Sequence, residues 1–257
     1  MNRSDLLYGI HPILEALRSA ERQIEGIYLQ HGRKGREIDE VLTLAKSKRV
    51  TIDFRPKEAL DRLTGLAHHQ GAVAMVAAKA YLSLDELMAV VASTERPPLL
   101  LILDGIEDPH NLGAILRTAE AAGVDGVIIP ERRAVGLTAT VAKASAGAIE
   151  YLPVARVVNL SQTIERLKKG NFWIYALDGK GDQNFLSIDY RGALALVIGG
   201  EGRGIRPLVA AHCDARIHIP MKGRVSSLNV SVAVGVLLYE VLRQRTGGDS
   251  IKPAGTE

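Results

Sequence analysis

The sequence predicts an α/β protein with a mainly parallel sheet. Short apolar runs alternate with helical patterns along most of the 257 residues, and helices between successive strands favour parallel pairing. Leu99–Leu103 is a continuous apolar run, as expected of a strand covered on both faces. Two later runs, Leu194–Ile198 and Ile217–Ile219, end in loops rich in Gly, Ser or Asn. Because ligands of open α/β sheets bind beyond the carboxyl ends of strands, we expect a binding site at these loops.

Residues 1–80 are expected to form a small α/β domain of their own. We expect a helix over His11–Ser19 and another at the helical spacing of Ile38, Val41, Leu42 and Ala45. Pro56 can occupy the first turn of a third helix. The expected strands are Gly26–Gln30, Val50–Phe54 and Ala72–Ala77.

This segment is also the basic part of the chain. It carries 13 Lys and Arg against 10 Asp and Glu. Two interpretations are open, namely solvated helix faces or a surface that contacts phosphates. Many of these cations lie between residues 33 and 62: Arg33, Lys34, Arg36, Lys46, Lys48, Arg49, Arg55, Lys57 and Arg62.

Residues 81–98 are expected to link this domain to a larger one. Ser83 and Glu86 have the spacing of a capping box for one short helix, and Pro97 and Pro98 stiffen the approach to the next strand. We therefore expect a second domain over residues 99–247 and a frayed tail over residues 248–257.

The second domain repeats the alternation with longer elements. Leu112, Ile115, Leu116 and Ala119 mark one helix face, and Gly123 is expected to close that helix. Further expected elements are a strand at Val124–Ile129, helices at Thr138–Ala146 and Asn159–Lys169, and a strand at Phe172–Leu177. A last helix, from Leu228 to Leu242, is apolar almost all round and must be buried on several sides.

Composition excludes several classes of protein. The net charge of +3 permits nucleic-acid binding without indicating it. The single cysteine, Cys213, excludes an internal disulfide and a multi-cysteine metal site, and we expect no metal. The sequence has neither a signal-peptide pattern nor an apolar stretch of the ~20 residues that a membrane span needs, so we expect a cytoplasmic protein with no membrane contact. A dinucleotide-binding fingerprint and a P-loop are both missing, which argues against hydride transfer and nucleotide hydrolysis.

Three polar clusters could carry chemistry. The first pairs Asn111 with Arg117, although Asn111 could be a helix cap and Arg117 a solvated helix residue. The second is Gly199–Gly204, where four glycines surround Glu201 and allow the backbone to approach a ligand. The third lies at Ser226, Ser227 and Asn229, and a helix cap explains only one of these three side chains.

These clusters resemble the motifs of a known family. N-L-G-A-I-L-R-T-A-E-A-A-G, I-G-G-E-G-R-G-I and I-P-M…S-S-L-N-V-S-V-A look like the three motifs of the SpoU-type (TrmH-type) RNA 2′-O-ribose methyltransferases, which belong to the SPOUT class. The match covers residues 99–245 in order. Y-G-I-H-P-I-L-E-A-L and H-H-Q-G-A-V-A are similar to the L30e-like RNA-binding domain fused to some members. The arrangement is most similar to members that modify a guanosine of bacterial 23S rRNA.

The resemblance implies a fold and a partner set. It implies a carboxyl-terminal trefoil knot, which topology rules alone would not suggest because chain threading is rare. It also implies RNA, most simply rRNA, as the substrate, S-adenosylmethionine (SAM) as the cofactor, and a homodimer. Two alternatives stay open: a tRNA 2′-O-methyltransferase, which shares all three motifs, and a non-catalytic RNA-binding protein of ribosome assembly.

Individual positions receive roles by the same resemblance. Gly199, Ile219 and Leu228 are expected to contact the cofactor. Arg117 is expected to handle the proton of the ribose hydroxyl, with Asn111, Glu201, Ser227 and Asn229 arranging the site. A guanidinium has a pKa above ~12, so Arg117 either takes the proton or only clamps a phosphate and orients the hydroxyl.

Overall fold

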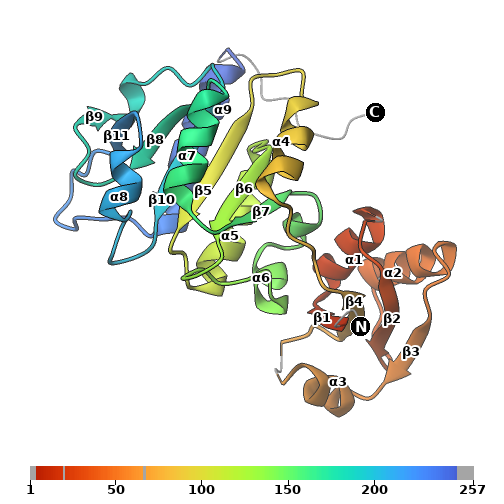
Figure 1. The fold of residues 1–257 in the computed structure, drawn as a ribbon. Helices are drawn as coiled ribbons and strands as arrows, with labels where there is room; N and C mark the ends of the chain where they lie inside the picture. Colours follow the sequence, from red (N-terminus) through yellow and green to blue (C-terminus); the bar gives the residue numbers. More distant parts are fainter. Residues whose placement is uncertain (1–3, 20, 66–67, 248–257) are drawn as a thin grey trace. The chain divides into compact units, whose positions relative to one another are not determined.

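The computed structural model describes residues 4–19, 21–65 and 68–247, which form two compact units. The first unit comprises the described residues up to Ala80 together with residues 108–117 and 135–152. The second comprises residues 81–107 and 118–134 and the described residues from Pro153 onwards. The expected frayed tail lies outside the described residues. Figure 1 labels the helices and strands of both units.

The first unit contains a four-stranded sheet in the order β1-β4-β2-β3. Its strands are β1 (Ser4–Tyr8), β2 (Ile24–Gln30), β3 (Ile52–Arg55) and β4 (Ala72–Ala77), and its first helices are α1 (Ile10–Ser19), α2 (Arg36–Ser47) and α3 (Lys57–Thr64). β4 pairs antiparallel with β1 and β2, whereas β2 and β3 are parallel. Each predicted strand and helix is present, and Pro56 is the N-cap of α3. Strand β1 was not predicted, because its five residues, S-D-L-L-Y, are few and show no alternation of polar and apolar side chains.

Two later segments complete this unit. They contain the start of α5 (Pro109–Ala121), α6 (Ala139–Ala144) and a short 3₁₀ helix at Ala148–Glu150. A buried ion pair joins them to the amino-terminal residues, since Nη1 of Arg22 lies 2.9 Å from Oε1 of Glu150. Tyr8 Oη and Thr140 Oγ1 lie 3.2 Å apart and connect the end of β1 to α6.

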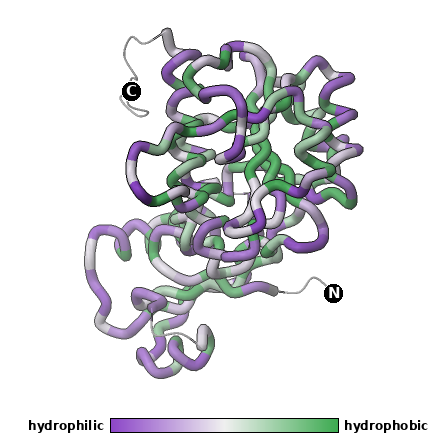
Figure 2. The backbone as a smooth tube through the Cα atoms, turned by 90° about the vertical axis from the view of Figure 1, so that its left-hand side faces the viewer, coloured by the Kyte–Doolittle hydropathy of each residue, from purple (hydrophilic) through white to green (hydrophobic). Residues whose placement is uncertain are grey.

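The second unit is built on a seven-stranded sheet in the order β7-β6-β5-β10-β8-β11-β9. The strands are β5 (Leu99–Asp104), β6 (Gly126–Pro130), β7 (Val154–Val157), β8 (Trp173–Leu177), β9 (Gln183–Asn184), β10 (Leu194–Gly199) and β11 (Ala215–His218). Every pair is parallel, which confirms the predicted sheet. β5 and β10 are its adjacent central strands and are almost wholly buried. Figure 2 shows hydrophobic segments inside and hydrophilic segments along the outer loops.

Helices cover both faces of this sheet. α4 (Leu84–Ala92), α7 (Leu160–Lys169) and α8 (Pro207–Ala211) contribute to one buried cluster through Leu87, Ile164 and Val209. α9 (Val230–Arg245) lies on the opposite face, behind the sheet in Figure 1. The capping box of Ser83 and Glu86 at α4 is confirmed. No described helix is long and apolar enough to cross a membrane.

Side chains at the end of α9 hold the loop that leads into β10. Gln244 accepts a hydrogen bond from Tyr190 N and donates to Ile188 O, at 3.0 and 2.9 Å. Arg245 donates from Nε to Tyr190 O at 3.0 Å and from Nη2 to Gly192 O at 2.7 Å. The carboxyl-terminal helix is thereby fastened to the central strands. The trefoil knot that the resemblance implies stays a prediction.

Two local expectations need correction. Asn111 does not cap α5, because the carboxylate of Asp108 accepts the hydrogen bonds from His110 N and Asn111 N and so stands at the cap. The expected strand Ile217–Ile219 begins two residues earlier and ends one residue earlier, at Ala215–His218, because pairing with β8 begins at Ala215. By contrast, Gly123 ends α5 with a φ of 73°, as predicted.

Candidate active site

The glycine-rich loop after β10 folds back onto the end of β5. Gly200 N donates to Asp104 O, and Gly204 N donates to Gly200 O, each at 2.9 Å. A Cβ at Gly200 would lie 2.0 Å from Gly105 O, and one at Gly199 would lie 2.2 Å from the carbonyl carbon of Gly204. Any side chain at these two positions would collide with backbone, so the loop geometry requires glycine.

An ion pair between a buried carboxylate, Asp104, and an exposed arginine, Arg206, fastens the far end of the same loop. Asp104, the last residue of β5, is only 2% exposed. Its Oδ2 accepts a hydrogen bond from Arg206 N at 2.9 Å, and its Oδ1 accepts one from Arg206 Nε at 2.7 Å. Asp104 therefore holds both ends of the loop, one through its backbone carbonyl and the other through its carboxylate. The sequence analysis did not predict the Asp104–Arg206 pair. The one sequence feature that points to it is the charged Asp104 directly after the apolar run Leu99–Leu103.

The structure brings Glu201 and Asn229 together from two predicted clusters. Asn229 Nδ2 donates to Glu201 Oε1 at 2.8 Å. Asn229 Oδ1 accepts from Ser231 N at 2.9 Å and so caps α9, which confirms that one residue of the third cluster is a helix cap. The side-chain amide of Asn229 caps the helix through its oxygen and contacts Glu201 through its nitrogen. Together the two hydrogen bonds hold the carboxylate of Glu201 beside the first turn of α9.

The segment between β11 and α9 carries the remaining predicted positions of this unit. Ile219 directly follows β11 and is half-buried, whereas Ser227 and Leu228 are exposed. His218, the residue before Ile219, has a buried Nδ1 with no hydrogen-bond partner among the described residues. An exposed apolar side chain, a close-packed glycine backbone and an unsatisfied ring nitrogen suit a ligand with a flat ring and polar edges. These residues therefore fit the adenosine portion of SAM.

Asn111 and Arg117 belong to the first unit. Both stand on α5, where Asn111 is half-buried and Arg117 is exposed. The apolar face of this helix formed as predicted, since Leu112, Ile115, Leu116 and Ala119 are buried. Arg117 directly follows the buried Leu116 and lies beside the apolar face. Because its side chain is exposed, its guanidinium is available to an external anion.

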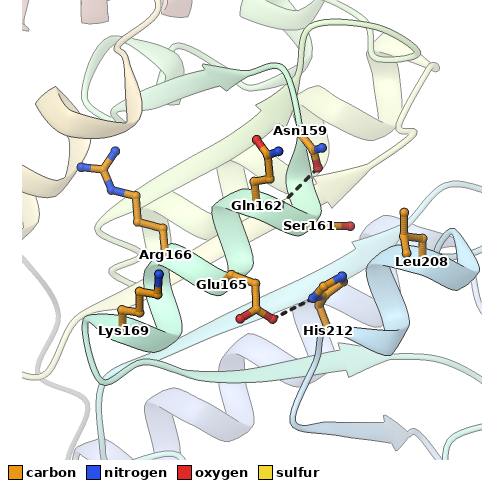
Figure 3. Close-up of a pocket in the computed structure, with 8 residues that line it drawn as sticks. All are labelled: Asn159, Ser161, Gln162, Glu165, Arg166, Lys169, Leu208 and His212. Carbon is orange, nitrogen blue, oxygen red and sulfur yellow. Dashed lines mark hydrogen bonds and ion pairs between the residues drawn. The ribbon is translucent and has the colours of Figure 1, made fainter.

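A hollow of about 540 Å³ lies between α7 and α8. Figure 3 shows the residues that line it, including the bond of 2.7 Å between His212 Nδ1 and Glu165 Oε1, which lowers the pKa of Glu165. None of the predicted site residues lines this hollow.

Cys213 is partly buried, and burial raises the pKa of its thiol to about 12. It is therefore a protonated thiol at neutral pH and not a nucleophile.

Comparison with known proteins supports the resemblance seen in the motifs. Residues 98–239 match the model of the SpoU rRNA methylase family, and residues 6–82 match the model described as RNA 2′-O ribose methyltransferase substrate binding. A protein of Bacillus subtilis named as a putative TrmH family tRNA/rRNA methyltransferase, YacO, is 46% identical over 94% of this chain and 96% of its own.

Solved structures share the fold. The SpoU methyltransferase AviRb of Streptomyces viridochromogenes, crystallised with its cofactor AdoMet, superposes with a TM-score of 0.80 at 24% identity, over 95% of this chain and 92% of its own. A structure described as an RNA 2′-O ribose methyltransferase gives a TM-score of 0.78 at 26% identity, over 95% and 90% of the two chains. The family match over more than half of the chain and the relative at 46% identity lead to one conclusion: the chain belongs to the SpoU family of RNA methyltransferases, which use SAM.

Proposed function

We propose that the chain transfers the methyl group of SAM to a ribose 2′-hydroxyl of a guanosine in 23S rRNA. The observation that carries this proposal is the pairing of a close-packed glycine loop with the Glu201–Asn229 contact at the carboxyl end of the parallel sheet. The match of residues 6–82 to an RNA substrate-binding model supports RNA as the acceptor.

In this proposal the cofactor is held mainly by backbone. Gly199 offers amide and carbonyl groups without a side chain, and Ile219 and Leu228 offer apolar surface from the segment before α9. SAM, when bound, supplies an electrophilic methyl group. The chain's own contribution is to orient the acceptor oxygen and exclude competing water, since a displacement at carbon needs an aligned nucleophile.

The polar residues arrange the acceptor. Arg117 clamps a phosphate of the RNA and orients the neighbouring hydroxyl, because its planar fork of donors matches a phosphate. Glu201 is held by Asn229 and is the ionisable group best suited to accept a proton. Asn111 and Ser227 supply further hydrogen bonds to the substrate.

The proposal includes a homodimer formed through α9. Residues of this helix such as Leu237 and Leu238 are buried within their own chain. Val232, Val236 and Tyr239 are nevertheless exposed at spacings of four and three, which places them on one helix face. We expect light scattering to give a dimer mass at micromolar concentration and Val236→Asp to give a monomer. A monomeric wild-type protein would contradict this part of the proposal.

Two experiments test the function against its alternatives. Calorimetry with SAM separates an enzyme from a non-catalytic RNA-binding protein, which need not bind the cofactor. Mapping of 2′-O-methyl groups in RNA from a deletion strain separates rRNA from tRNA. We expect one 23S rRNA guanosine to lose its methyl group while tRNA is unchanged. Loss of a tRNA modification alone would show that the chain acts on tRNA.

A further inference from the structure

In the first unit, an exposed turn lies at one end of the parallel strands β2 and β3. The turn carries several cations and one of two stacked rings. Residues 31–36 (H-G-R-K-G-R) follow β2 and are all exposed, and Arg55 ends the adjacent strand β3. His31 N donates to Arg55 O at 2.9 Å and Arg33 N donates to Gln30 O at 3.2 Å, which tie the turn to both strands. The turn is therefore held in a defined place at the sheet edge.

Two rings meet at this edge. The rings of His31 and Phe54 are stacked, with centroids 6.2 Å apart and planes at 26°. Phe54 is 44% exposed, although it pairs in register with the fully buried Leu29. Phe54 therefore lies on the same face of the sheet as Leu29 and leaves much of its apolar ring surface exposed.

The turn of residues 31–36 carries three cations and no acidic residue. Arg33, Lys34 and Arg36 form no ion pair within the part of the chain that the structure describes. Arg55 lies over the ring of Tyr28 at 5.6 Å while it pairs with Asp53. Such cations on the turn that carries His31, together with the exposed ring of Phe54 on which His31 stacks, are the combination that binds single-stranded nucleic acid, with phosphates on the cations and a base on the ring.

We propose that an unpaired base of the substrate RNA stacks on Phe54 while Arg33, Lys34 and Arg36 contact its flanking phosphates. A duplex would not use the ring of Phe54, because the bases of an A-form helix are not available for stacking on a protein ring. The inference rests on the proposed function only in taking RNA as the substrate. It assigns the RNA-binding unit a preference for looped or extruded nucleotides.

The test is binding of a short single-stranded oligoribonucleotide of mixed sequence, and of the same strand in a duplex, to the full chain. Phe54→Ala should weaken single-strand binding about tenfold, the effect of losing one stacked base. It should leave the slope of log K against log salt unchanged. Arg33→Gln with Lys34→Gln should instead reduce that slope by about 0.7 for each cation removed. Duplex binding should be unaffected by Phe54→Ala.

Matched variants separate stacking from a structural role. Phe54→Tyr keeps the ring and should bind as wild type, whereas Phe54→Leu keeps an apolar side chain without a ring and should bind as weakly as Phe54→Ala. Leu63→Ala is the control, since Leu63 is also 44% exposed in the same unit but lies on α3. A 2-aminopurine placed in the strand should be quenched by wild type and by Phe54→Tyr alone.

Wild-type affinity in Phe54→Leu, or an equal loss in Leu63→Ala, would overturn the inference. Failure of the inference and failure of the proposed function give different results. If the variants bind RNA like wild type and the protein still methylates RNA, the stacking site is wrong and the function stands. If wild-type protein binds the single strand through Phe54 but methylates no RNA, the stacking site stands and the function is wrong.

Discussion

At the scale of single residues, Arg117 is the most direct test of the proposed chemistry. It is exposed beside the buried face of α5, so Arg117→Ala should change the free energy of unfolding by only about 0.5 kcal/mol or less. SAM affinity should also survive. Methyl transfer should fall by orders of magnitude, because a residue that orients the acceptor acts on turnover. Near-normal single-turnover rates in Arg117→Ala would remove this residue from the mechanism.

Arg117→Lys refines the same measurement. Lysine retains the positive charge and loses the planar fork of donors. We expect little recovery of turnover if Arg117 orients the phosphate and hydroxyl. Substantial recovery would instead indicate simple attraction between charges.

Asp104 makes a second prediction at this scale. Asp104→Asn removes the charge and leaves one acceptor oxygen where two donors of Arg206 now bind. Hydrogen bonds to charged groups contribute about 1.5–3 kcal/mol, so the loosened loop should weaken SAM binding about tenfold or more in calorimetry. Asp189→Asn, at an exposed pair with Arg191, is the matched control and should bind SAM normally. Full SAM affinity in Asp104→Asn would show that the clamp does not position the cofactor.

At the scale of elements, α9 should stabilise the fold in a pH-dependent way. Hydrogen bonds from Arg243 and Gln244 hold the pKa of Glu240 below its ordinary value of 4.5. A carboxyl with a lowered folded pKa stabilises the protein above its unfolded pKa, and this contribution disappears as pH falls through the folded pKa. Urea unfolding should show wild type more stable than Glu240→Gln at pH 7, with the difference shrinking below pH 4.5. A difference that is constant with pH would contradict this account.

Most elements could be predicted because their signals are local. Ala72–Ala77 is an apolar run bounded by turns and forms β4 over the same residues. The capping box at Ser83 needs only residues within one turn. The cap of α5 was wrongly placed at Asn111 because Asp108 and Asn111 are both good caps, and only the hydrogen bonds choose between them.

The candidate site was predictable only in part, for a related reason. Two parts of the site stood out as polar or glycine-rich clusters at the ends of elements, namely Gly199–Gly204 and Asn229. Because parallel strands end at the same edge of a sheet, the loops that follow them can meet there, as Glu201 and Asn229 do. The Asp104–Arg206 clamp joins residues 102 positions apart, and neither residue belongs to a recognisable local pattern. The order of the strands in the sheet decides which charged residues meet at its end. The spacing of apolar residues in the sequence predicts the strands and does not predict their order.

At the scale of the whole molecule, the first unit depends on a buried ion pair between distant segments. Arg22 is 8% exposed and Glu150 is fully buried, with Oε2 of Glu150 unpaired among the described residues. Arg22→Met should lower the free energy of unfolding by about 3–5 kcal/mol, because it leaves an uncompensated buried carboxylate. Adding Glu150→Met should restore much of that loss, and urea unfolding checks both.

The control for this prediction is a surface pair. Arg191→Met breaks the exposed contact with Asp189 and should cost less than about 1 kcal/mol. A double variant as unstable as Arg22→Met alone would show that packing, and not charge, joins the segments. The same pair means that deleting residues 1–80 would leave Glu150 without Arg22. Point substitutions therefore test RNA binding better than truncation.

The central claim, transfer of a methyl group to a ribose oxygen, is tested most directly by the alkali stability of the product. RNA is methylated by the protein with SAM that carries tritium in its methyl group, and the product is hydrolysed in alkali. Alkaline cleavage requires a free 2′-hydroxyl, so a 2′-O-methylated nucleotide remains joined to its neighbour. The account predicts label in an alkali-resistant dinucleotide. Label in mononucleotides would place the methyl group on a base and contradict it.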